Sequence, residues 1–295
     1  GVEGIYLVTI APTEAREGVA PVLGTASEST TCKHRVRVEA VEFHLTAIGE
    51  PYVLASDLAD PNRRRNRVAY KFLGDAVRGS WVRDPFGVGE RPGPLLDQLP
   101  DRLLGPCEVP LALLHWTLAD GITFVDAWSV RRRPSGPPAR GEGAWVLGGN
   151  SVAEGEARFL QFQDQIRDMS RSSSPGGITA SDGFETLPSA GLLPLKSARF
   201  PRGFDRSWFP ASMTRRGPVH LNGARLQELV RHSFAYPPVR LDSREFFCLY
   251  LLRENQPAVG TTPEVQECLV FASGHLPMVA EPRLNLSYWN LSNYL

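Results

Sequence analysis

Residues 109–130, VPLALLHWTLADGITFVDAWSV, carry the strongest structural signal in this 295-residue sequence. Two apolar runs, 109–117 and 122–130, are joined by a short segment that ends in Asp120-Gly121. An Asp-Gly pair between apolar runs is typical of a tight β-hairpin, because both residues accept the left-handed backbone conformation that the turn requires. We therefore expect a β-hairpin here, in a protein built mainly of antiparallel strands.

Four further segments have the apolar pattern of β-strands, namely 5–10, 34–47, 245–252 and 267–276. Within the second of them, the apolar residues occupy even positions up to Val38 and odd positions from Val41 onward. Because the side chains of a strand alternate between its two faces, this change of one residue predicts a β-bulge at Ala40-Val41.

Two segments have the periodicity of α-helices. The first, Ser151–Met169, begins with Ser151 and Glu154 at the spacing of a capping box. Its expected apolar face contains Phe159, Phe162, Ile166 and Met169. The second, roughly 223–233, follows Asn222, a residue type that accepts hydrogen bonds from the first turn of a helix.

The sequence thus predicts an α+β fold dominated by antiparallel hairpins and sheets, with two or three helices and long irregular loops. The segment 131–143 (RRRPSGPPARGEG) has the composition of a linker. We therefore expect an N-terminal β-rich lobe at 1–140 and a C-terminal α+β lobe at 141–295. Residues 178–218 are rich in Pro and Gly, and we expect irregular extended structure there. We expect the long irregular stretch 171–218 to lie on a partner surface.

Charge and hydropathy exclude several classes of protein. Lys+Arg and Asp+Glu each number 32, and this zero net charge excludes a broad, charge-driven binder of nucleic acid. No apolar run approaches the ~20 residues that a membrane-spanning helix needs, so we expect no membrane span. The sequence begins at Gly1 with a strand pattern already at 4–10, so we expect a further N-terminal region in the full protein.

The four cysteines predict free thiols in a reducing compartment. Cys32, Cys107, Cys248 and Cys268 are far apart and form no C-x-x-C pair. Cys248 and Cys268 lie in apolar runs, where we expect buried thiols. This pattern favours a cytoplasmic protein, or one that belongs to a particle assembled in the cytoplasm.

No local catalytic or cofactor motif is present in the sequence. A phosphate-binding G-x-x-x-x-G-K-[ST] loop, a helix-opening G-x-G-x-x-G, H-E-x-x-H and G-x-S-x-G are all missing. We therefore expect no cofactor. Cys32, His34 and His44 share one predicted strand and could form part of a zinc site, but we favour a structural role and expect no metal.

Three residues are weighed as parts of a dispersed hydrolase site: Asp126, His115 and His275. We favour a structural Asp–Arg pair between Asp126 and the arginines at 131–133, because a carboxylate in an apolar strand is costly unless it is paired. We expect His115 to be a core or hairpin-flanking histidine. His275 follows Ser273-Gly274, residue types that suit acyl transfer and a strand-end turn equally well. We therefore expect a protein that is not an enzyme.

Arginine and aromatic residues indicate a protein interface. Of the 32 basic residues 29 are arginine, whose planar guanidinium pairs with carboxylates and stacks on aromatic rings. Aromatic residues are not interleaved with these arginines as single-strand nucleic-acid binding requires, so we expect no nucleic-acid partner. The candidate interface residues are Arg63, Arg64, Arg65, Arg131, Arg132, Arg133, Trp208, Phe209 and Trp289, and the two tryptophans and Phe209 are expected to be exposed.

Five segments together resemble a family of large, functionally uncharacterised bacterial proteins. They are 107–116 (CEVPLALLHW), 124–133 (FVDAWSVRRR), 157–165 (ARFLQFQDQ), 233–239 (SFAYPPV) and 269–276 (LVFASGHL). Members are associated with the gene clusters of contractile injection systems and phage-tail-like particles, and they carry a preceding N-terminal region. The resemblance implies a structural or accessory component, such as a baseplate or peripheral tail protein.

Three functions follow from these observations. The preferred one is a non-enzymatic component of a phage-tail-like contractile injection particle, with other subunits of the assembly or further copies of itself as partners. The second is a carbohydrate- or ligand-binding module whose platform is formed by aromatic residues of the C-terminal lobe. The third is the hydrolase with a dispersed active site.

Overall fold

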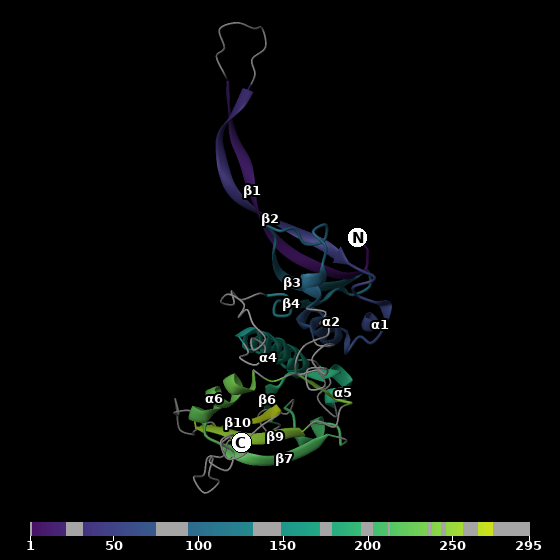
Figure 1. Ribbon diagram of the computed structural model, residues 1–295, viewed down its shortest axis with the longest axis vertical. Coiled ribbons are helices and arrows are strands. Elements are labelled where there is room, and N and C mark those ends of the chain that lie inside the picture. The colour runs from purple at the N-terminus through teal and green to yellow at the C-terminus, as the bar shows by residue number, and fades with distance from the viewer. Residues whose placement is uncertain are drawn as a thin grey trace, which may run out of the picture. The chain divides into compact units, whose positions relative to one another are not determined.

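The computed structural model describes most of the chain as a mixed α+β protein (Figure 1). The described residues are 2–21, 32–74, 94–131, 149–171, 179–195, 203–211, 213–234, 236, 238–242, 246–255 and 265–273. They form two compact units. Unit 1 contains 1–53 and 98–132, and unit 2 contains 54–97 and 133–295. The expected boundary near residue 140 lies outside the described residues.

The strands of unit 1 are β1 (Gly4–Pro21), β2 (Cys32–Ile48), β3 (Val109–Thr117) and β4 (Gly121–Asp126). The strands of unit 2 are β5 (Thr186–Leu187), β6 (Ala190–Pro194), β7 (Thr214–Leu221), β8 (Val239–Arg240), β9 (Phe246–Asn255) and β10 (Val265–Ser273). The helices are α1 (Ala55–Leu58), α2 (Arg64–Leu73), α3 (Leu95–Gln98), α4 (Gly149–Arg171), α5 (Ala180–Gly183), the 3-10 turn η2 (Arg206–Trp208) and α6 (Gly223–Ser233).

Unit 1 is a four-stranded antiparallel sheet in the order β2-β1-β3-β4. The expected hairpin is confirmed as β3 and β4, and Gly121 has the positive φ of +70° that its turn requires. β4 is shorter than expected because the chain turns after Asp126. The Oδ1 atom of this residue accepts hydrogen bonds from the backbone N–H groups of Trp128 at 3.0 Å and Ser129 at 2.9 Å.

The expected bulge at Ala40-Val41 is wrong. β1 and β2 keep one register from Ile5↔Ile48 to Pro21↔Cys32, with Thr13 opposite Ala40 and Pro12 opposite Val41. The apolar pattern changes position because apolar side chains of β2 are exposed on both of its faces. An apolar pattern reports the register of a strand only where a single face is buried.

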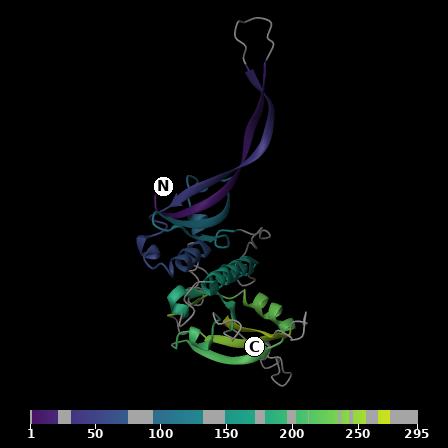
Figure 2. The same cartoon turned by 180° about the vertical axis from the view of Figure 1, so that it is seen from behind.

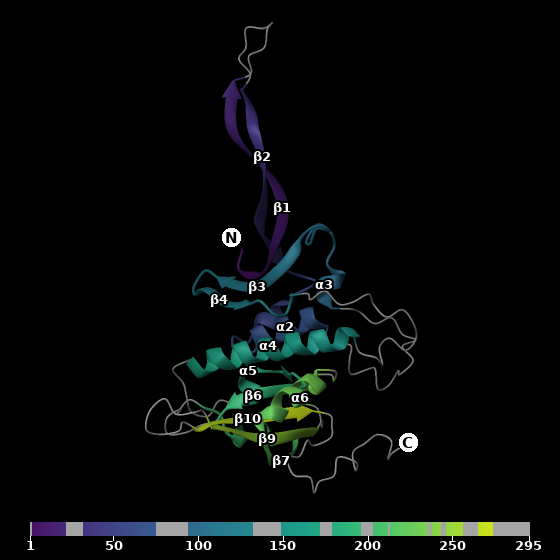
Figure 3. The same cartoon turned by 90° about the vertical axis from the view of Figure 1, so that its left-hand side faces the viewer.

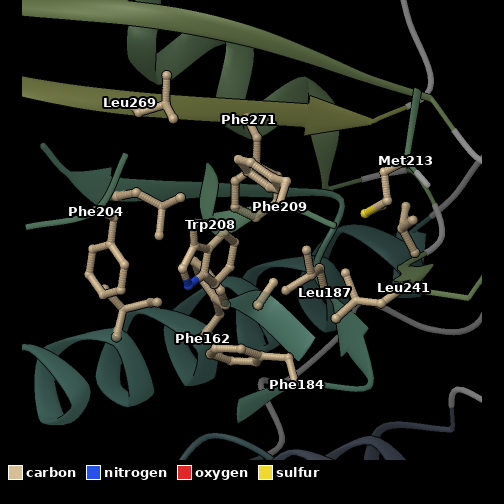
Figure 4. Packing of buried hydrophobic residues seen from close by; sticks show 14 of the residues in the cluster. Phe162, Phe184, Leu187, Phe204, Trp208, Phe209, Met213, Leu241, Leu269 and Phe271 are labelled. Atoms are coloured by element: carbon tan, nitrogen blue, oxygen red, sulfur yellow. The ribbon is translucent and has the colours of Figure 1, made fainter. Parts of the chain in front are cut away.

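Unit 2 contains a sheet in the order β6-β10-β9-β7, in which β7 runs parallel to β9 and the other pairs are antiparallel. Alternate residues of β9 and β10 enter two separate hydrophobic clusters. Leu249, Leu269 and Phe271 lie on one face with Phe162 of α4, while Tyr250 and Val270 lie on the other with Leu229 of α6. Both faces of this sheet are therefore buried. Figure 2 shows the ribbon of the sheet and its helices from behind, and Figure 4 shows the cluster that contains Phe162 and Phe271.

The two predicted helices are confirmed. In α4, Phe162 and Ile166 are buried, Met169 packs against the same cluster, and Phe159 contacts Phe234 with ring centroids 5.6 Å apart. α6 spans the predicted residues, and Asn222 Oδ1 accepts from the N–H of Ala224 at 3.0 Å. The capping box at Ser151 is wrong, because α4 begins two residues earlier, at Gly149.

The segment 178–218 is also different from the expectation, since its described residues supply much of the core of unit 2. They include α5, β5, β6, η2 and most of β7. Its buried apolar side chains include Phe184, Leu187, Leu193, Phe204, Trp208 and Phe209. The Pro and Gly residues of this segment therefore mark short elements that pack tightly, and its described apolar residues are not a partner surface.

Gly155 of α4 offers a direct test of the packing between α4 and α6. A Cβ atom at this position would lie 2.2 Å from the carbonyl oxygen of Phe234. In an exposed helix, Gly→Ala stabilises by about 1 kcal/mol. We predict the opposite sign here, with Gly155→Ala lowering the free energy of unfolding by about 2 kcal/mol or more, measured by urea denaturation.

The exposed Val152 of the same helix provides the control. Val152→Ala changes no buried contact, so we expect an effect within about 0.5 kcal/mol. A Gly155→Ala protein as stable as the parent would contradict the packing of these two helices.

Candidate protein-interaction surface

β1 and β2 extend far beyond the four-stranded sheet of unit 1. β1 pairs with β3 only from Gly4 to Ile10, whereas its pairing with β2 continues to Pro21. We call the two-stranded extension, Ala11–Pro21 with Cys32–Glu42, the β arm (Figure 3). At about 3.3 Å per residue it is roughly 35 Å long.

Apolar side chains are exposed on both faces of the β arm. Val36 and Val38 lie on one face with exposures of 51% and 37%, and Val41 lies on the other with 60%. An isolated two-stranded ribbon is marginally stable in water, because it has no core to bury such side chains. The exposed ion pair Arg37–Glu14, at 3.3 Å, adds little stability.

The paired part of the sheet in unit 1 has one buried face and one open face. Ile5, Leu7 and Leu113 point to the buried face with exposures of 1% or less. The strand registers place the alternate residues on the other side, which we call the open face. The open face is defined by the ten larger side chains of Tyr6, Val8, Ile10, Phe43, Leu45, Val109, Leu114, Trp116, Ile122 and Val125, and the registers also place Ala47 and Ala112 on it.

The open face is apolar and uncharged. Phe43 and Leu45 are 66% and 64% exposed, Val109 and Ile122 are 56% and 59% exposed, and Val125 is 50% exposed. An antiparallel sheet with one solvated face ordinarily alternates apolar and polar residues. This sheet carries apolar residues on both faces, which is typical of a surface that another protein covers.

The first arginine cluster lies at the N-terminal end of α2, and most of its arginines pair with acidic residues of unit 2. Arg65, which is buried, donates to Asp168 at 2.7 Å, and Arg67 donates to Glu185 at 2.8 Å. Arg63 lies 3.4 Å from Asp60, and Arg64 is half-buried. Three arginines of this cluster therefore have acidic partners in the same chain.

The side chain of Asn66, between these arginines, connects α2 to the start of β5 by hydrogen bonds. Its Nδ2 donates to the carbonyl of Thr186 at 2.9 Å. Its Oδ1 accepts from the backbone N–H groups of Glu185 at 2.9 Å and Thr186 at 3.1 Å. The side chain is 1% exposed, so these bonds are shielded from water. The sequence gives only a weak signal for this contact, because the side chain of an asparagine inside a helix can have many other partners.

Of the second arginine cluster, 131–133, the structure describes only Arg131. Arg131 is exposed and its guanidinium lies 5.6 Å from the centroid of the Trp128 ring, the geometry of a cation–π contact. Arg132, Arg133 and Trp289 lie outside the described residues.

The expectation that Trp208 and Phe209 are exposed is wrong. Their exposures are 1% and 2%, and their ring centroids lie 4.9 Å apart in an edge-to-face arrangement (Figure 4). Phe162, Phe184 and Phe204 also contact the Trp208 ring. Trp208 is therefore the centre of the unit 2 core, and neither residue forms part of an aromatic binding platform.

The structure brings Asp126 and His115 to the same buried face of the β3–β4 hairpin. Asp126 is 1% exposed and terminates β4 as described above, while His115 is 3% exposed. His115 Nδ1 lies 2.6 Å from Thr123 Oγ1, and its ring stacks on Phe124. The expected structural role of His115 is confirmed, and substrate has no access to either side chain. His275 lies outside the described residues.

The described cysteines are free thiols. Cys248 is buried, and burial raises the pKa of the Cys268 thiol to about 11. The expected buried thiol is confirmed for Cys248, whereas Cys268 is half-buried. Within the described part of the chain, no group of three His, Cys, Asp or Glu side chains is arranged to hold a metal ion. The side chains of Cys32 and His34 lie outside that part.

An ion pair between His44 and Glu108 in unit 1 connects β2 to the residues before β3. Glu108 accepts from the backbone N–H of Gly105 at 3.0 Å and lies 2.5 Å from Nδ1 of His44. The hydrogen bond to Glu108 raises the pKa of His44 above 6.5, and Glu42 adds to the effect. The bond from Gly105, followed by that from His44, lowers the pKa of Glu108 below 4.5.

Comparison with protein-family models, with curated proteins and with solved structures finds no match to this chain. None of the described helices is both long and apolar enough to cross a membrane. The sequence analysis did not identify the β arm or the open face. Their sequence signal was the apolar residues at both odd and even positions of 36–45.

We predict that Asn66→Ala lowers the free energy of unfolding by about 2–4 kcal/mol, because it leaves the buried backbone groups of Glu185 and Thr186 without their partner. Urea denaturation measures the effect. Asn62→Ala, at an exposed position just before α2, is the control and should change stability by less than about 0.5 kcal/mol. Equal effects of the two substitutions would contradict the role of Asn66.

We predict that the stability contributed by His44 depends on pH. Its raised pKa stabilises the fold below pH 6.5, and this contribution is lost as pH rises through the folded-state pKa. The lowered pKa of Glu108 stabilises the fold above pH 4.5, and this contribution is lost as pH falls through its folded-state pKa. The pair is therefore most stabilising between these values.

Thermal unfolding of the parent and of His44→Gln from pH 4 to pH 9 tests this prediction. The difference in Tm should be largest near pH 5–6 and should decrease on either side. A difference that does not vary with pH would show that the ion pair contributes nothing.

Proposed function

We propose that this chain is a non-enzymatic structural subunit of a multi-subunit protein assembly, and that the β arm reaches into a neighbouring subunit. The main support for this proposal is the structure of the β arm. It extends roughly 35 Å beyond the third strand of its sheet and exposes valines on both faces. Such a ribbon gains stability when a neighbour covers its apolar side chains, at about 25 cal/mol for each Å² removed from water.

The arrangement of hydrogen-bonding groups supports the same role. Beyond Ile10, the outer edges of both β1 and β2 pair with no other strand among the described residues. Unpaired N–H and C=O groups on an extended edge can add a strand from a partner. The β arm can therefore bind a neighbour both through its apolar faces and through its backbone.

The proposed class of assembly rests on the resemblance of five segments to proteins of contractile injection gene clusters. We propose a baseplate or peripheral tail protein of a phage-tail-like contractile injection particle, assembled in the cytoplasm. Its partners would be other subunits of the particle or further copies of this chain. The buried positions of Trp208, Phe209, Asp126 and His115 favour this function over a carbohydrate-binding module or a hydrolase.

The test is a chain without the β arm. Residues 12–41 are replaced by Asn-Gly, which joins Ala11 to Glu42, two residues that are paired in the parent. Since the described residues of the β arm belong to neither hydrophobic cluster of unit 2, the variant should keep the parent Tm within about 2 °C.

The measurement is co-sedimentation of the tagged chain with native particles from its own cells. We expect the parent and the Val152→Ala control to sediment with sheath and tube proteins, and the variant without the β arm to lose at least nine-tenths of this association. A parent chain that remains alone in the lysate, or a variant that assembles as well as the parent, would contradict the proposal.

A further inference from the structure

We infer that the open face of unit 1 binds the same face of a second copy of this chain, so that two copies form a twofold-symmetric dimer. The open face is separate from the β arm, and this inference does not depend on the type of assembly proposed above. It follows from the chemistry, area and geometry of the open face.

The chemistry of the open face requires an uncharged, apolar partner surface. The ten side chains that define it include no Asp, Glu, Lys, Arg or His. A charged partner surface would lose its hydration against these side chains without gaining a compensating ion pair. The open face is itself such an uncharged surface, so a second copy supplies a partner of the required chemistry.

The area of the open face fits a stable dimer. With ordinary side-chain areas, its five exposed members alone correspond to roughly 500 Å² of accessible surface, and its five half-buried members add to this area. A standard interface buries about 800 Å² on each partner. A patch of this size is at least as large as the largest apolar patch on most monomers.

The geometry of the open face is that of one half of a β-sandwich. Apolar faces of two antiparallel sheets pack about 10 Å apart, with their strands about 30° from parallel. In a twofold dimer the same patch of both copies forms the interface, so one self-complementary surface is enough to make the dimer. Phe43 and Leu45 of β2 and Ile122 and Val125 of β4 project from the two outer strands of this face.

The test is the mass of the purified full chain in solution. Sedimentation velocity at tens of micromolar should give twice the chain mass of 32.5 kDa. Phe43→Glu on β2 and Ile122→Glu on β4 should each raise the dissociation constant at least 100-fold, because each places a charge in the apolar interface. Both side chains are more than half exposed in the single chain, so near-UV circular dichroism should remain that of the parent.

Val36→Glu is the matched control. Val36 lies on the same strand as Phe43 and is 51% exposed, but it points to the opposite face. We expect its dissociation constant to stay within about threefold of the parent value. A monomeric parent, or a dimer that responds equally to Val36→Glu and Phe43→Glu, would overturn the inference.

A second measurement avoids any charge in the sheet. With p-benzoylphenylalanine at position 43, ultraviolet light should crosslink two copies of the purified chain. The same group at position 36 should give less than one-tenth of that product. Equal crosslinking at the two positions, or none at position 43, would also overturn the inference, whereas neither result affects the proposed role of the β arm in a particle.

Discussion

The structure of unit 1 depends on one constraint: an antiparallel sheet that is apolar on both faces needs cover on both. Ile5, Leu7 and Leu113 show that one face is covered within the chain. The opposite face leaves Phe43, Leu45 and Ile122 in contact with water. The β arm has the same property over a greater length, since its valines are exposed on both sides. Both features are consistent with a protein that is completed by its neighbours.

In unit 2, residues of the same chain cover both faces of the sheet. Its sheet buries Phe271 and Leu249 on the face of α4 and Tyr250 and Val270 on the face of α6. Glycines permit this close packing. A Cβ atom at Gly191 of β6 would lie 2.5 Å from the rings of both Phe162 and Phe271. The two units therefore differ in how their sheets are covered. Unit 2 buries both faces of its sheet, whereas unit 1 leaves one apolar face exposed.

Local patterns predicted the elements of this fold better than they predicted its surface. The β3–β4 hairpin and α6 followed from Asp120-Gly121 and Asn222, because a turn and a helix cap are decided by neighbouring residues. The burial of Trp208 and the pairing of Arg65 with Asp168 depend on residues distant in sequence. A pattern also cannot show whether an apolar face is covered, so the residues at 36–45 suggested a bulge where the structure has an open ribbon.

The central claim is that unit 1 makes its contacts with other protein chains, and hydrogen–deuterium exchange of the β arm tests it most directly. In the free chain, amides of 11–21 and 32–42 belong to a two-stranded ribbon and should exchange within seconds to minutes. In particles that contain the chain, the same amides should exchange at least 100-fold more slowly. Identical exchange in the free and assembled states would contradict the claim.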